Sequence, residues 1–99
     1  MDFTTALSKF STPKTIPTLG GQSDFTVSSE DGVLIIKNSS GTTRSINMEY
    51  WEEVKKRRRS LGNSKNSTSM YTDPEWDLPY PTDRIFAPYV AAVMRYLEG

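Results

Sequence analysis

The feature that most constrains the fold is the dipeptide Asp31-Gly32, which lies between two runs of strand-forming residues. Asp-Gly is a strong signal for a two-residue hairpin turn, because both residues tolerate positive φ angles. The run before it, 25–28, alternates apolar and polar side chains as a half-buried strand does. The run after it, 33–37, is strongly apolar and predicts a central strand. We therefore expect an antiparallel hairpin here.

The residues that follow extend this hairpin and then change period. Asn38-Ser39-Ser40-Gly41 is typical of a turn, and residues 42–46 predict a third strand at the edge of the sheet. Asn47 is a favourable N-cap for a helix over residues 48–60, which Gly62 is placed to end. Met48, Trp51, Val54 and Leu61 lie in one stripe of that helix, so this stripe is expected to pack on the sheet.

Two further helices are predicted, at the two ends of the chain. Residues 2–10 place Phe3, Ala6, Leu7 and Phe10 at helical spacing, and residues 87–97 belong to a longer periodic stretch that begins at Ile85. We interpret residues 11–23 as a linker and residues 62–84 as a long irregular loop. The predicted fold class is α+β: one domain of 99 residues, with a three-stranded antiparallel meander over about 24–46 packed against two or three helices.

The composition restricts the chemistry that the chain can perform. It contains no cysteine and no histidine, so thiol catalysis, serine–histidine catalysis and the common zinc sites are excluded. We predict no cofactor, no metal site and no catalytic residue. A carboxylate-based hydrolase is the third functional hypothesis, and no acid–base pair can be named for it.

The run Lys55-Lys56-Arg57-Arg58-Arg59 allows two interpretations. Glutamates precede it on the same helix, so the cations can complement the helix dipole and form pairs such as Glu52–Lys56 and Glu53–Arg57. Alternatively the run binds the phosphates of a nucleic acid, although a net charge of zero argues against this. The candidate phosphate contacts are Arg44, Lys55, Arg57, Arg58 and Arg59.

The segment 71–81 combines aromatic side chains with prolines and acids. Tryptophan and tyrosine are frequent at protein interfaces, but a large aromatic side chain can equally fold back and cover the core. The leading hypothesis is a non-enzymatic protein-interaction module that binds a protein partner or forms a homodimer. Its candidate interface residues are Phe3, Leu7, Phe10, Tyr71, Trp76 and Tyr80.

The N-terminal residues lack the basic and apolar regions of a secretory signal, and no apolar run is long enough to span a membrane. We therefore expect a cytoplasmic protein with no membrane contact. In its size and its lack of motifs, the chain resembles small proteins of mobile elements such as integron cassettes or phages.

Overall fold

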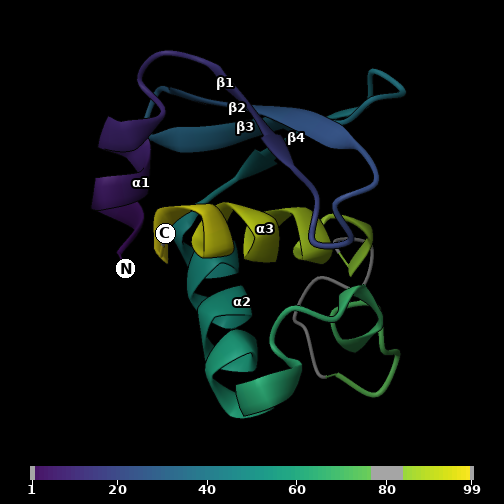
Figure 1. The fold of residues 1–99 in the computed structure, drawn as a ribbon. Helices are drawn as coiled ribbons and strands as arrows, with labels where there is room; N and C mark the ends of the chain where they lie inside the picture. The colour runs from purple at the N-terminus through teal and green to yellow at the C-terminus, as the bar shows by residue number, and fades with distance from the viewer. Residues whose placement is uncertain (1, 77–83, 99) are drawn as a thin grey trace.

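The computed structural model describes residues 2–76 and 84–98. It confirms the predicted α+β class: an antiparallel sheet lies above helices α2 and α3, and helix α1 lies beside one end of the sheet (Figure 1). The elements in chain order are α1 (Phe3–Lys9), β1 (Lys14–Pro17), β2 (Asp24–Glu30), β3 (Val33–Lys37), β4 (Thr43–Ile46), α2 (Met48–Leu61), the short 3₁₀ turns η1 (Gly62–Ser64) and η2 (Thr68–Met70), and α3 (Ala87–Glu98).

The predicted hairpin is confirmed in detail. Glu30 pairs with Val33, so Asp31 and Gly32 form a two-residue loop between β2 and β3. Their φ angles are 52° and 80°, as a turn with both central residues in the left-handed region requires. The next connection is organised by Asn38, whose side-chain oxygen accepts hydrogen bonds from the backbone N–H groups of residues 40 and 42. Local turn chemistry therefore sets the register of the meander.

The sheet has four strands rather than the three that the sequence predicts, in the order β1-β2-β3-β4. The additional strand, β1, lies in the segment that we interpreted as a linker, because two prolines there suggested irregular backbone. Pro17 is tolerated because β1 is an edge strand, where a missing N–H leaves no neighbour unpaired. Ile16 pairs with Phe25 and both side chains are buried. Burial of Ile16 thus favours strand pairing in a short polar segment.

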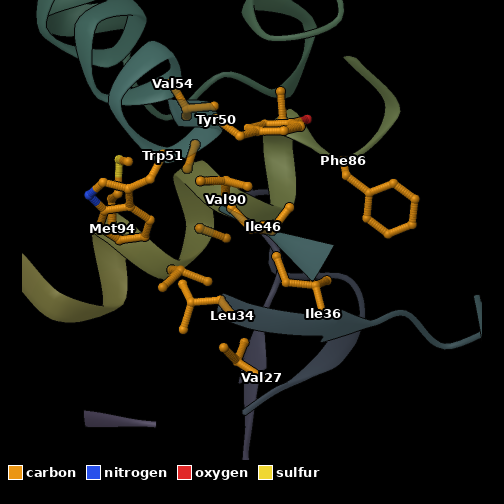
Figure 2. Close-up of a cluster of buried hydrophobic side chains, with 14 of the residues drawn as sticks. Val27, Leu34, Ile36, Ile46, Tyr50, Trp51, Val54, Phe86, Val90 and Met94 are labelled. Carbon is orange, nitrogen blue, oxygen red and sulfur yellow. The ribbon is translucent and has the colours of Figure 1, made fainter. Parts of the chain in front are cut away.

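The core lies between the sheet and helix α3, which runs beneath the strands (Figure 1). One face of the sheet contributes Val27, Leu34, Ile36 and Ile46, and Figure 2 shows these side chains directed toward Val90 of α3. Helix α3 is buried on most of its surface, because the sheet covers one side and α2 packs on another. An apolar helix enclosed in this way belongs to the core. Its buried residues are Ala87, Val90, Ala91, Ala92, Val93 and Met94.

Ile85 departs from the predicted apolar stripe. It precedes the first residue of α3 and remains 69% exposed, whereas Tyr89 and Leu97 are partly buried. Of the residues spaced four apart from Ile85, Val93 is fully buried, so this spacing identified the buried face of α3 only in part. That face is centred on the apolar residues between Val90 and Met94.

Helices α1 and α2 begin as the sequence predicts. Asp2 accepts a hydrogen bond from the backbone N–H of Thr5 at 2.8 Å, and Asn47 accepts one from Tyr50 at 2.9 Å. Both are side-chain N-caps, which satisfy a donor that the helix leaves unpaired. None of the helices in residues 2–76 and 84–98 has the length and apolar character of a membrane span.

Candidate functional site

The basic run on α2 is divided among several environments, beginning with Arg57. Its guanidinium donates two hydrogen bonds to the backbone carbonyl of Met70, at 3.0 Å and 2.8 Å. It also lies 5.5 Å from the ring centre of Trp76 and 3.8 Å from a carboxylate oxygen of Asp73. The predicted partner, Glu53, instead pairs with Lys56. Arg57 therefore fixes the segment that follows α2 and does not present its charge to a ligand.

Arg58 is buried, with 4% of its surface exposed, and it joins three parts of the chain. Its guanidinium donates to both carboxylate oxygens of Glu98, at 2.7 Å and 3.3 Å. It also donates to the carbonyl of Lys65 at 2.7 Å and to the side-chain oxygen of Asn66 at 3.0 Å. A buried cation is stable only when it is paired and hydrogen-bonded, and these contacts supply both conditions. The hydrogen bonds from Arg58 also hold the pKa of Glu98 below its ordinary value.

Tyr71 completes this network. Its hydroxyl donates to the carbonyl of Lys65, and it accepts a 3.4 Å hydrogen bond from Arg58. Burial raises the pKa of the Tyr71 hydroxyl, so the group remains a neutral donor at physiological pH. The network therefore connects α2, the polar loop and the end of α3 by side-chain hydrogen bonds.

Of the remaining cations of the run, Lys56 and Arg59 are exposed and Lys55 is partly buried. Lys55 lies 3.9 Å from Glu52, and Lys56 lies 3.4 Å from Glu53. Acidic partners on the same helix were predicted, but these pairs join residues three apart instead of four. Exposed pairs of this length contribute little energy, so the cations keep most of their capacity to bind another anion.

A hollow of about 590 Å³ lies at the C-terminal end of α2. Its volume falls in the range of typical small-ligand pockets. Four cationic side chains line it against a single carboxylate, which gives the hollow a positive electrostatic character. Its lining residues are Lys55, Arg58, Arg59, Gly62, Asn63, Lys65, Asn66, Met94 and Glu98. Two other hollows lie beside α1 and beside the β1–β2 connection, and neither is lined by a carboxylate.

The structure brings three of the five candidate phosphate contacts together and separates the other two. Lys55, Arg58 and Arg59 line the basic hollow, whereas the guanidinium of Arg57 contacts the carbonyl of Met70 outside that lining. Arg44 pairs with Ile36, which places it on the sheet face that packs against the helices, and it acts electrostatically on Tyr50. Tyr50 and Arg59 are near opposite ends of α2, about 13 Å apart at about 1.5 Å per residue. Arg44, which acts on Tyr50, is therefore at the other end of α2 from the basic hollow.

The candidate interface residues lie mainly inside the chain. Phe3, Phe10, Tyr71 and Trp76 are buried, and Leu7 is partly buried against the core. Phe3 packs on Trp51, and Tyr71 meets Trp76 edge to face. Tyr80 lies outside the described residues.

Two charged residues of the hollow were not predicted, Lys65 and Glu98. Lys65 lies in a polar loop whose position depends on the fold, so the sequence gives no sign of its role. Glu98 offers a weak signal, because a carboxylate in the last turn of a helix opposes the helix dipole and requires a compensating cation. Arg58 supplies that cation.

Comparison with models of known protein families, with curated proteins and with solved structures finds no match for this chain. Within residues 2–76 and 84–98, no group of three or more acidic, histidine or cysteine side chains is arranged to hold a metal ion. The geometry and charge of the basic hollow are therefore the features of the molecule that bear on its function.

Proposed function

We propose that this protein is a non-enzymatic interaction module that binds an acidic segment of a protein partner in the basic hollow at the end of α2. The observation that supports the proposal is the concentration of cations around a concave surface. Lys55, Arg59 and Lys65 line this surface and reach solvent. The carboxylate of Glu98 is paired mainly with Arg58. An incoming carboxylate can therefore be stabilised by up to three cations at once.

The ion pairs that these cations make within the chain do not compete strongly with a ligand. Lys55 and Lys65 lie 3.9 Å and 3.8 Å from their carboxylate partners, beyond hydrogen-bonding distance. Arg58, by contrast, is held at 2.7 Å and is nearly inaccessible. Arg58 therefore shapes the floor of the hollow, and the surrounding cations supply the binding energy.

A nucleic acid is the alternative ligand, because phosphates also bind lysine and arginine. A protein partner is favoured because the chain has no net charge and the cations of the basic run point in different directions. A nucleic-acid-binding surface normally extends as a basic face along the backbone. The hollow instead suits a short acidic segment.

The test is fluorescence anisotropy with a labelled oligoglutamate peptide and a single-stranded oligonucleotide of equal charge. The double variant Lys55→Glu/Arg59→Glu is expected to bind the peptide about tenfold more weakly, which corresponds to about 1.4 kcal/mol. The matched control is Lys9→Glu/Lys37→Glu, which makes the same charge change at exposed lysines outside the hollow and is expected to lose much less.

Three results would overturn the proposal. They are an absence of peptide binding by the wild type at low ionic strength, an equal loss of affinity in both double variants, and tighter binding of the oligonucleotide than of the peptide. The last of these would support the nucleic-acid alternative.

A further inference from the structure

The chain itself carries an acidic segment, the turn Asp73–Trp76, which is rigid and exposed at its tip. The backbone N–H of Trp76 donates to the carbonyl of Asp73 at 3.1 Å, and that of Glu75 donates to the Asp73 side chain at 2.9 Å. Pro74 lies between the two acids and restricts the backbone further. The side chain of Asp73 is 38% exposed and Glu75 is exposed. Such a preformed turn loses little conformational entropy on binding.

The base of the turn is fixed to the same helix that carries the basic hollow. Trp76 is buried, meets Tyr71 edge to face with 6.3 Å between ring centres, and lies under the guanidinium of Arg57. The next residue, Arg58, lines the hollow. An acidic surface and a basic surface therefore lie close together in a region held by hydrogen bonds.

The turn cannot bind in the hollow of its own chain while the contacts of Arg57 and Trp76 hold it in place. Asp73 pairs with Arg57, whose guanidinium contacts the carbonyl of Met70 and not the lining of the hollow. The exposed carboxylate of Glu75 and the cations around the hollow thus remain available to another molecule, and Asp73 is partly exposed beside its 3.8 Å contact with Arg57.

We propose that the acidic segment bound in the hollow is the Asp73–Trp76 turn of a second copy of this chain. This inference rests on the proposed function, and it names the partner. A surface with neighbouring acidic and basic parts is complementary to itself across a twofold axis, so each turn enters the hollow of the other copy. A net charge of zero means that the two copies do not repel each other as they approach. Because the contacts are ion pairs at a surface, the dimer weakens as salt is added.

A charge-swap experiment with sedimentation equilibrium tests the inference. Lys55→Glu/Arg59→Glu makes the hollow acidic. Asp73→Asn/Glu75→Lys makes the turn basic, and the asparagine retains the oxygen that accepts the Glu75 N–H. Each variant alone is expected to dimerise about tenfold or more weakly than the wild type. An equimolar mixture is expected to recover dimerisation, because each altered surface then meets one of opposite charge.

Circular dichroism of each variant checks that it folds. If a double variant does not fold, the single substitutions Arg59→Glu and Glu75→Lys replace the double variants in the mixing experiment. A wild-type monomer at every concentration and salt tested would overturn the inference. So would a mixture of folded variants that does not dimerise, or a single variant that dimerises like the wild type. The oligoglutamate assay probes the hollow alone, so peptide binding without recovery in the mixture would reject the second copy and leave the proposed function standing.

Discussion

The sheet with helix α3 can be compared with the segment 62–76, because both pack against α2 but are held to it by different interactions. The sheet and α3 meet through apolar side chains such as Leu34, Ile36 and Val90, which are fully buried. The segment contributes two buried aromatic side chains, Tyr71 and Trp76, and is otherwise polar and exposed or partly exposed. It is held mainly by hydrogen bonds from two arginines.

The comparison shows that neighbouring cations in one run can have different physical roles. Arg57 and Arg58 donate hydrogen bonds to the backbone carbonyls of Met70 and Lys65, in a segment whose own backbone hydrogen bonds form short turns. Lys56, on the same helix, faces solvent. The first two hold structure together, and the exposed cations beside them are available for binding.

The largest loss of stability is expected in the apolar core, where the sheet and α3 pack. Trp51→Ala should lower the free energy of unfolding by about 3–5 kcal/mol, because it removes a fully buried aromatic side chain and leaves a cavity. Urea denaturation measures this change. The control is Met48→Ala on the same helix, where the side chain is 55% exposed and a change of about 0.5 kcal/mol or less is expected. Equal costs at the two positions would contradict an apolar core beneath α2.

A smaller loss of stability is expected where hydrogen bonds hold the segment 62–76. Arg58→Met retains the aliphatic stem but leaves Glu98 and the Lys65 carbonyl without their donor, which should cost about 2–3 kcal/mol. Hydrogen exchange should accelerate more in residues 62–76 than in β2 and β3. Lys56→Met is the control, because its exposed ion pair is worth about 0.5 kcal/mol or less. Similar hydrogen-exchange rates in the Arg58→Met and Lys56→Met variants would refute the conclusion that Arg58 holds residues 62–76 in place.

The smallest effect concerns the charge of Glu98. Because Arg58 lowers the pKa of this carboxyl from 4.5, its ionised form stabilises the fold above that pH, and the contribution is lost as the pH falls through the folded-state value. The carboxyl is about one-third exposed, so Glu98→Gln should cost only about 1 kcal/mol at neutral pH. Thermal melts should show the variant and the wild type converging below pH 4.5. A constant difference at every pH would show that the charge of Glu98 does not matter.

Much of the fold could be predicted because its signals are local. Asp31-Gly32 specifies its own turn, Asn47 caps the helix that it precedes, and the alternation of β2 and the apolar run of β3 are each visible within a few residues. Strand β1 could not be predicted, because its pairing depends on β2 and its prolines favour irregular structure. The buried surface of α3 was predicted only in part, since α2 and the sheet cover the helix from two sides.

The sequence alone determined the α+β class, the hairpin, the helix starts and the exclusion of histidine and cysteine chemistry, since each depends on residue type or on neighbours in the chain. Only the tertiary structure decided where the charges lie. Glu98 reaches Arg58 across forty residues, and Lys65 joins them through a loop that the fold positions. The burial of Arg58 and the exposure of Lys56 and Arg59 follow from which side of α2 the rest of the chain covers.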